Sequence, residues 1–185
     1  MHKQLSCIIY LIDFHGHPSL GDDHSNNQRY STLIDICASP KIDKTKTIIV
    51  SSKIDFREKV VEVKKIAQGR GWDWIEFDGD TIDDFEQTLF DQGYLIRYNT
   101  KIIFGGTNTS GCVFKTKGTS LIKFAEFGYK TELHLPLCAE YHTVGINPSE
   151  KNARAYSIIY NEIKKNPKLL DNIEISCKTN EISYI

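Results

Sequence analysis

The sequence predicts an α/β protein in which a largely parallel β-sheet is covered by helices on both faces. Short apolar runs rich in isoleucine and valine alternate along the chain with longer stretches of helical periodicity. Strands that alternate with helices in this way form parallel sheets with both faces covered. Because no internal repeat, low-complexity tract or linker interrupts the pattern, we expect a single domain over residues 1–185.

The first half of the chain begins with an apolar run at 6–13, which predicts a buried strand, and a polar loop then leads to a helix at 27–38. A second strand is expected at 46–52. The helix expected at 56–69 has apolar side chains at near-helical spacing and ends in glycine. Its apolar positions include Val60, Val61, Val63 and Ile66. Residues 72–77 are the third expected strand.

The second half continues the alternation. A helix at 81–93 is indicated by Thr81, a good N-cap residue, and by Asp83 and Asp84, whose carboxylates favour the first turn of a helix. Pro148 lies near the start of the last helix. The other expected elements are strands at 100–106, 129–135 and 172–176, and helices at 111–127 and 148–167.

Composition excludes several classes of function. The chain has 185 residues, of which 40% are hydrophobic and 25% charged, with a net charge of -1. This balance gives no reason to expect nucleic acid or an anionic membrane as a partner. No apolar run approaches the roughly 20 residues of a membrane helix, and the N-terminal segment lacks the features of a signal peptide. We therefore expect a cytoplasmic protein.

The cysteines do not suggest a disulfide framework or a thiolate zinc site. Their number is odd, their spacing is wide, and no CxxC pair occurs. They are Cys7, Cys37, Cys112, Cys138 and Cys177. Most are expected to be small buried side chains, and Cys112 is the exception.

Parallel α/β sheets bind ligands beyond the carboxyl ends of their strands, which selects the segments after Asp13, Ser52 and Gly106. The last of these segments has the spacing of a phosphate-binding loop between Gly106 and Gly111. Such a loop then requires a lysine and a hydroxyl residue, but Cys112 and Val113 follow. The sequence therefore does not encode a phosphate loop.

A cysteine at a strand–turn–helix junction has a different use. The unpaired N–H groups and the dipole at the start of a helix favour the thiolate, which is the reactive form of cysteine. The same N–H groups can stabilise the oxyanion of a tetrahedral intermediate. Cys112 is thus a candidate nucleophile, and a buried thiol flanked by glycine is the structural alternative.

The segment "IIFGGTNTSGCVFKT" resembles the nucleophile segment of the isochorismatase-like cysteine hydrolases, a family that includes nicotinamidases and N-carbamoyl amide hydrolases. The later "FGYKTELHLPLCAE" and the early "SCIIYLIDFHGH" resemble two further strand segments of that family. Only the cysteine segment is specific. The positions in it that fit the family pattern are Gly106, Thr107, Thr109, Ser110, Cys112, Val113 and Thr116.

The resemblance implies a three-layer α/β/α fold with a largely parallel, six-stranded, Rossmann-like sheet. It also implies that Cys112 is the nucleophile and Asp13 its general base. A strained, often cis, peptide near Thr107–Asn108 would shape the oxyanion hole, to which Gly111 and Cys112 would present N–H groups. A small-molecule substrate, a homo-oligomer and no cofactor are the corresponding expectations.

The chain departs from the family where a lysine is expected after the third strand. That stretch reads "WIEFDGDTIDDF" and contains carboxylates but no lysine. Carboxylates would oppose a thiolate. Lys53, after the second strand, is a candidate replacement, and an exposed loop lysine is the alternative. In addition, the interval from Cys112 to Gly128 is about one helical turn longer than the family pattern, and His15 stands where the family commonly has glutamine.

The loop at 13–24 holds three histidines and three aspartates. Imidazole and carboxylate groups can bind a metal, but His15 and His17 need not converge, and we expect no metal site here. Phe14 and His15 are instead candidate substrate contacts. Trp74 and Phe77, from the third expected strand, are further candidates, although tryptophan in a strand is more often a core residue.

Three readings remain open, the last being a doubly wound domain that merely carries a Gly-Cys turn and has no pocket that joins Asp13 to Cys112. The first is a cysteine hydrolase that cleaves a C–N amide or related bond of a small molecule through a thioester. The second is a catalytically inactive member of the same family that binds a small molecule or a protein. The missing lysine favours the second, and the presence of both Asp13 and Cys112 favours the first.

Overall fold

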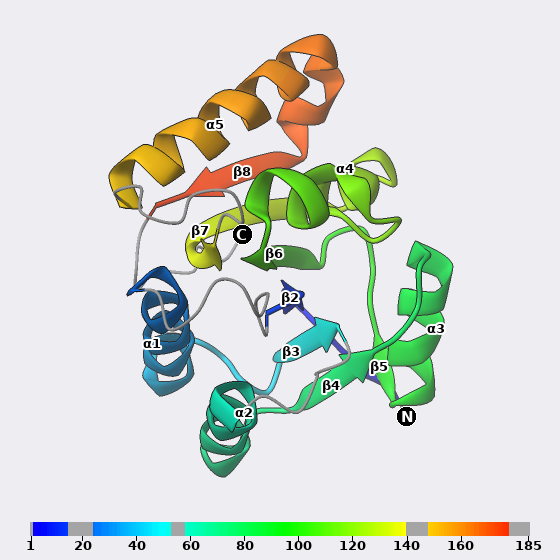
Figure 1. Cartoon of the computed structure of the whole chain (residues 1–185). Coiled ribbons are helices and arrows are strands. Elements are labelled where there is room, and N and C mark those ends of the chain that lie inside the picture. Colours follow the sequence, from blue (N-terminus) through cyan, green and yellow to red (C-terminus); the bar gives the residue numbers. More distant parts are fainter. Residues whose placement is uncertain (1, 15–23, 53–57, 140–147, 178–185) are drawn as a thin grey trace.

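The computed structural model describes residues 2–14, 24–52, 58–139 and 148–177. Its centre is a six-stranded sheet in the order β4-β3-β2-β6-β7-β8, and every pair of neighbouring strands is parallel (Figure 1). The predicted α/β/α fold is confirmed. No helix in these ranges is long and apolar enough to cross a membrane.

The elements follow the expected alternation closely. The strands of the main sheet are β2 (Cys7–Ile12), β3 (Thr47–Ser52), β4 (Trp74–Phe77), β6 (Lys101–Thr107), β7 (Lys130–Ala139) and β8 (Ile173–Ser176). The helices are α1 (His24–Ala38), α2 (Glu58–Gly69), α3 (Ile82–Asp91), the π-helix η2 (Thr109–Thr116), α4 (Leu121–Glu126), α5 (Pro148–Lys165) and the 3-10 helix η3 (Pro167–Asp171).

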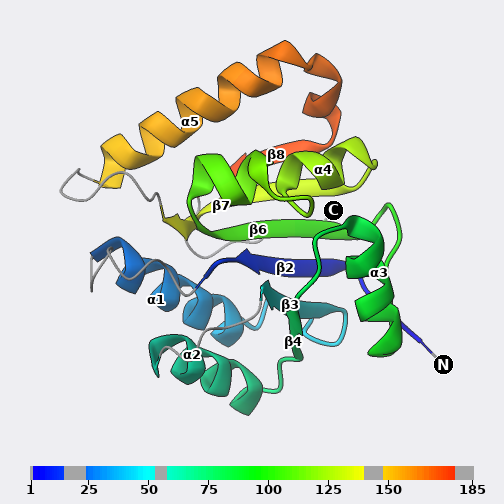
Figure 2. The ribbon, with the colours of Figure 1, turned by 45° about the vertical axis from the view of Figure 1, so that its right-hand side comes forward.

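Helices cover both faces of the sheet, as Figure 2 shows from the side. α1 and α2 pack on one face, where Leu33 and Val60 join a core that includes Ile9 of β2. On the other face, α3, η2, α4 and α5 surround an aromatic core centred on Tyr10 and Phe85. Because apolar side chains meet both faces, strands β2 and β6 are buried along their whole length.

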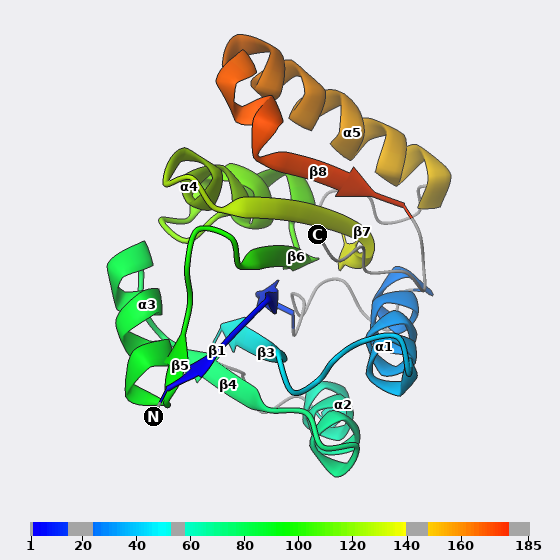
Figure 3. The same ribbon diagram turned by 180° about the vertical axis from the view of Figure 1, so that it is seen from behind.

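One short pairing was not predicted. β1 (Lys3–Gln4) and β5 (Tyr94–Leu95) form a separate two-stranded parallel sheet, seen from behind in Figure 3. The cap of α3 was predicted correctly. The Thr81 hydroxyl accepts from the Asp84 N–H, and the Asp84 carboxylate accepts from the Thr81 N–H, which together make a capping box.

The helix expected at 111–127 is wrong as one continuous element, because the chain forms η2, then an extended residue, then α4. Lys117 has φ -87° and ψ 151°, so the helix ends there, and Ser120 is the N-cap residue of α4. The break has a packing cause. A Cβ on Gly118 would lie 2.0 Å from the Asp80 carbonyl oxygen, so glycine allows this segment to approach the loop after β4.

β7 is longer than the expected 129–135 and contains a bulge. Its pairing with β6 runs from Phe104 opposite Leu133 to Gly106 opposite Cys138, which leaves additional β7 residues between the two pairs. Pro136, which has no N–H to donate to a ladder, lies in this bulge. After the bulge, Ala139 pairs with Thr107 and extends the sheet beside the carboxyl end of β6.

A charged cluster, buried except for Glu174, links the strands β6, β7 and β8. Lys101 Nζ lies 2.7 Å from Glu132 Oε2 and 2.9 Å from Glu174 Oε2, and His134 Nδ1 lies 3.0 Å from Glu132 Oε1. Burial alone would raise the pKa of Glu132, but hydrogen bonds from His134 and Lys101 outweigh it and lower the pKa below its ordinary value. Removal of one partner would leave a buried charge uncompensated, which is strongly destabilising.

Candidate active site

The candidate site lies at the carboxyl ends of three adjacent strands, β3, β2 and β6. Ile12, the last residue of β2, pairs with Gly106 of β6, and Leu11 pairs with Ser51 of β3. The residues that follow these pairs therefore emerge side by side. This is the edge of a parallel sheet where ligands bind.

Gly106 allows the strands β6 and β2 to approach each other closely. Its φ of 138° is one that L side chains rarely adopt, and a Cβ at this position would lie 1.8 Å from the Ile12 carbonyl oxygen. No other residue fits without moving the backbone. The contact fixes β6 against the residue that immediately precedes Asp13.

Asp13 is held in a left-handed backbone conformation, with φ 48°. Its N–H donates to Ser52 Oγ at 2.8 Å, so the end of β3 fixes the residue after the end of β2. Non-glycine residues at positive φ are uncommon, and aspartate and asparagine are the side chains most often found there. The strained turn directs the Asp13 carboxylate toward the segment that follows η2.

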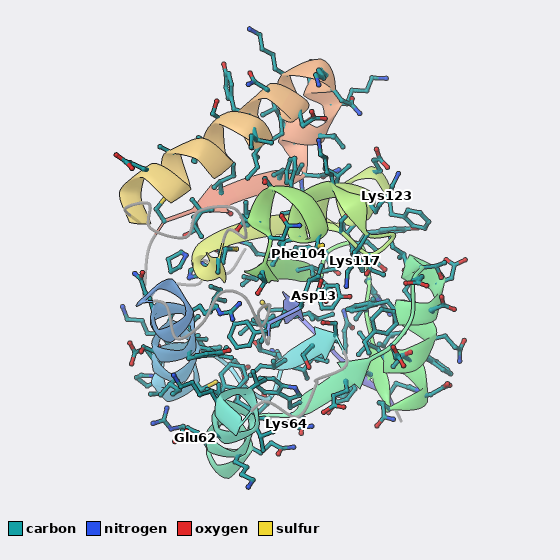
Figure 4. The ribbon with its side chains drawn as sticks, in the orientation of Figure 1. Asp13, Glu62, Lys64, Phe104, Lys117 and Lys123 are labelled. Atoms are coloured by element: carbon teal, nitrogen blue, oxygen red, sulfur yellow. The ribbon has the colours of Figure 1, made fainter. Side chains whose placement is uncertain are left out.

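Lys117 is the cationic partner of Asp13. Its Nζ donates to Asp13 Oδ1 at 2.8 Å, and Figure 4 shows the two side chains together at the end of β2. The Lys117 side chain is 38% exposed and that of Asp13 30% exposed, so the pair opens to solvent on one side. A continuous helix over 111–127 would not predict this contact, because Lys117 would then lie within the helix and not at its end.

Two contacts fix the segment that carries Lys117. Gly118 approaches the Asp80 backbone, as described above, and Tyr10 forms a buried hydrogen bond with Thr119, with 3.0 Å between the hydroxyl oxygens. Burial raises the pKa of Tyr10 well above its ordinary value, so its hydroxyl stays protonated. Asp80 belongs to the acidic stretch in which the family resemblance places a lysine. The segment that carries Lys117 therefore contacts the backbone of this stretch at Gly118.

Cys112 lies in η2, four residues after Asn108, and its side chain is half-buried. Single turns of π-helix occur frequently at functional sites. The amide nitrogen Nδ2 of Asn108 donates to Cys112 Sγ at 3.5 Å. The Gly111 N–H, expected to face an oxyanion, donates instead to the Asn108 carbonyl oxygen at 3.0 Å.

The peptide near Thr107–Asn108 was expected to be strained and often cis, and the described backbone contains no cis peptide. Asn108 instead has the left-handed values φ 61° and ψ 63°, and its N–H donates to the Ala139 carbonyl oxygen at 2.7 Å. The bulge in β7 places Ala139 opposite Thr107, where it can accept this bond. The backbone at the start of η2 is therefore strained at Asn108, without a cis bond.

The Thr107 side chain accepts a hydrogen bond from a buried arginine of α1. Arg29 Nη1 donates to Thr107 Oγ1 at 2.5 Å, and the guanidinium stacks on the rings of Phe14 and Tyr30 at 5.1 and 5.0 Å. Phe14, a predicted substrate contact, is 2% exposed and packs edge-on against Tyr30. In the described structure, Phe14 thus packs against the guanidinium that holds Thr107.

The other predicted substrate contacts are buried or lie outside the described residues. Trp74 begins β4, is 8% exposed and packs in the core beneath α1 and α2, and its indole donates to Ser51 Oγ at 3.0 Å near the carboxyl end of β3. Phe77 ends β4 but is 2% exposed and packs against Tyr10 and Phe85. His15 and Lys53 lie outside the described residues.

The remaining thiols have different environments. Burial raises the pKa of Cys7 and of Cys37 to about 12, so neither is reactive near neutral pH. Cys138 is half-buried and Cys177 is exposed. Within the described residues, no three His, Cys, Asp or Glu side chains form a group that could hold a metal ion. The histidines at 15 and 17 lie outside those ranges.

A surface groove of about 320 Å³ is lined by α3 and the residues around β5, including Glu86, Phe90 and Tyr94. β5 pairs with β1, which precedes β2 in the chain, so this part of the groove lies toward the amino-terminal ends of the strands. None of its lining residues belongs to the candidate site.

Comparison with known proteins supports the fold. No family model matches the sequence, and no curated protein matches it. The structure is similar to that of the MAR1 ribonuclease from Caenorhabditis elegans, with a TM-score of 0.54 and 12% sequence identity. The match covers 87% of this chain and 75% of the other. A likeness at this identity establishes shared architecture only.

Three residues of the site were missed by sequence analysis. Lys117 had a signal, because "KGTS" places a glycine and then a serine N-cap inside the expected helix. Ser52 was included only as the end of a strand. Arg29 had no signal, since its acceptor Thr107 is 78 residues away in sequence.

Proposed function

We propose that this protein is an isochorismatase-like cysteine hydrolase that cleaves a C–N amide or related bond of a small molecule. Cys112 is the nucleophile, Asp13 its general base and Lys117 the cation of the site. The proposal combines the resemblance of the cysteine segment with the positions of these residues at one edge of the sheet.

The observation that carries the proposal is the ion pair between Lys117 Nζ and Asp13 Oδ1 at 2.8 Å. The strongest argument against catalysis was the lack of a lysine after the third strand. Lys117 supplies an ammonium group at the carboxylate from the segment after η2, five residues beyond Cys112 in the chain. A cation so close to the base offsets the carboxylate charge that would otherwise disfavour a thiolate. The argument for a catalytically inactive protein is weakened accordingly.

The proposed reaction begins when the Asp13 carboxylate takes the thiol proton of Cys112. The thiolate attacks the carbonyl carbon and forms an S–C bond, and the negative charge moves to the carbonyl oxygen. As that oxygen reforms its double bond, the C–N bond breaks and protonated Asp13 gives its proton to the leaving nitrogen. Asp13 then deprotonates a water molecule, which attacks the thioester and releases a carboxylic acid and the Cys112 thiol.

The experiment that tests the proposal is a screen for ammonia release from a panel of small primary amides and N-carbamoyl compounds. The panel is run with the wild-type protein, Cys112→Ala and Cys177→Ala. We expect a hit that Cys112→Ala abolishes and Cys177→Ala leaves unchanged, with an acyl adduct on the Cys112 peptide by mass spectrometry. Turnover that survives in Cys112→Ala would refute the assignment of the nucleophile. Absence of turnover across the panel, with an unreactive Cys112, would support the binding function.

A further inference from the structure

Asn108 immediately precedes the π-helix that contains Cys112, and its backbone groups are committed to other partners. Its N–H donates to the Ala139 carbonyl oxygen at 2.7 Å. Its carbonyl oxygen accepts from the N–H groups of Gly111 at 3.0 Å and Val113 at 3.3 Å. The backbone N–H and C=O groups of Asn108 are therefore both hydrogen-bonded within the protein and are not available to bind a reacting group. Any direct part that Asn108 plays in the chemistry must come from its side chain.

The conformation of Asn108 determines where that side chain lies. Its φ of 61° and ψ of 63° are left-handed values, which asparagine tolerates better than most residues. The side chain then turns back over η2 toward the next turn of the chain. Its amide nitrogen lies 3.5 Å from Cys112 Sγ, within the range for a hydrogen bond to sulfur.

Gly111 makes room for this arrangement. A Cβ at Gly111 would lie 2.5 Å from Asn108 Nδ2 and 2.7 Å from Oδ1, so any larger residue would displace the amide. Gly111 does not have a positive φ, and the requirement for glycine is therefore one of space. The left-handed Asn108 and the missing side chain at Gly111 together place an amide donor against the sulfur.

We propose that Asn108 is a positioning residue whose Nδ2–H donates to Cys112 Sγ and stabilises the thiolate. The side-chain amide of asparagine donates N–H hydrogen bonds, and such a bond is stronger when the acceptor is an anion, here the thiolate, than when it is neutral. The bond therefore gains strength when Asp13 removes the proton. This role rests on the proposed function, because it concerns the same nucleophile.

The test is the rate of alkylation of Cys112 by iodoacetamide across a pH series, read by mass spectrometry of the Cys112 peptide. Asn108→Gly retains access to the left-handed backbone and removes the amide. Asn108→Asp retains the size and replaces the donor with a carboxylate. Asn172→Asp is the matched control, because the Asn172 amide bonds to the Ala125 carbonyl oxygen in another part of the fold.

We expect Asn108→Gly to slow alkylation at neutral pH by roughly tenfold, the size of one hydrogen bond to a charged group. Asn108→Asp should slow it further, because it adds a negative charge next to the sulfur. Both variants should reach the wild-type rate at high pH, where every thiol is ionised. A purely structural role would instead change the rate at all pH values.

The outcomes separate this proposal from the one on which it rests. If Lys117→Met shifts the pH profile but Asn108→Gly and Asn108→Asp match the wild type, the role of Asn108 is refuted and the proposed function stands. If the wild-type profile is that of an ordinary exposed thiol, the proposed function fails. In that case a shift in the Asn108 variants would still support the hydrogen bond, and no shift would refute it.

Discussion

Lys117 and Asp13 are 104 residues apart in sequence, and their side chains meet at 2.8 Å between Nζ and Oδ1. The pair joins the segment after η2, the helix that contains Cys112, to the end of the central strand β2. This contact exists because the helix ends at Lys117 instead of continuing to residue 127. The break in the helix is thus the feature that completes the candidate site.

The first prediction concerns the charge of Lys117. Lys117→Met would leave the Asp13 carboxylate without its cation, and the uncompensated charge would disfavour a thiolate at Cys112. We expect the rate of Cys112 alkylation at neutral pH to fall about tenfold, which corresponds to about one pH unit in the profile. The measurement is the pH dependence of that rate.

Lys115→Met is the matched control for this prediction. Lys115 lies on η2 but is exposed and forms an ion pair with Glu162 at 3.5 Å. Its replacement should leave the alkylation profile unchanged. Equal profiles for Lys117→Met and the wild type would show that the ion pair is only structural.

The second prediction concerns the close approach at Gly106. Gly106→Ala would place a methyl group 1.8 Å from the Ile12 carbonyl oxygen at a backbone φ of 138°. We expect a loss of about 3 kcal/mol or more in the free energy of unfolding, measured by urea denaturation. Gly69→Ala is the control, because nothing lies within 4 Å of its Cβ position. Equal stability of the two variants would refute this account of the strand contact.

The third prediction concerns the hydrogen bond that anchors the Lys117 segment. Tyr10→Phe would remove the buried partner of Thr119 and cost about 1 to 3 kcal/mol of stability, because the hydroxyl of Thr119 remains buried. We also expect slower alkylation of Cys112, since Lys117 would be held less firmly. Tyr156→Phe, on the exposed surface of α5, should change neither property. A stable Tyr10→Phe protein with the wild-type profile would contradict the anchoring role.

The fourth prediction concerns acid stability. Because hydrogen bonds from His134 and Lys101 lower the pKa of Glu132 in the folded state, its contribution to stability is fully present above the pKa of an unfolded glutamate, about 4.3. That contribution is lost as the pH falls through the lower folded pKa. Glu132→Gln should therefore lower stability at neutral pH and flatten its decline in acid. Thermal unfolding at several pH values below neutrality measures both effects. A wild-type acid decline in Glu132→Gln would exclude this group as its source.

The sequence predicted the parallel sheet because buried apolar runs and helical stretches alternate without ambiguity. The positions of Asp13 and Cys112 at the same edge follow from that fold, since Ile12 pairs with Gly106. The glycine and serine of "KGTS" signal a helix break, but the position that the break gives to Lys117 depends on a tertiary contact, that of Gly118 with Asp80. The left-handed turn of Asn108 depends likewise on an acceptor, Ala139, that only the bulge in β7 brings into position.

The central claim is that Cys112 is an activated nucleophile, and the most direct test is its alkylation profile in the wild-type protein. Cys177 is exposed and serves as the reference thiol in the same sample. We predict that alkylation of Cys112 reaches half its maximal rate at least about one pH unit below that of Cys177. A half-maximal pH for Cys112 equal to or above that of Cys177 would contradict the account.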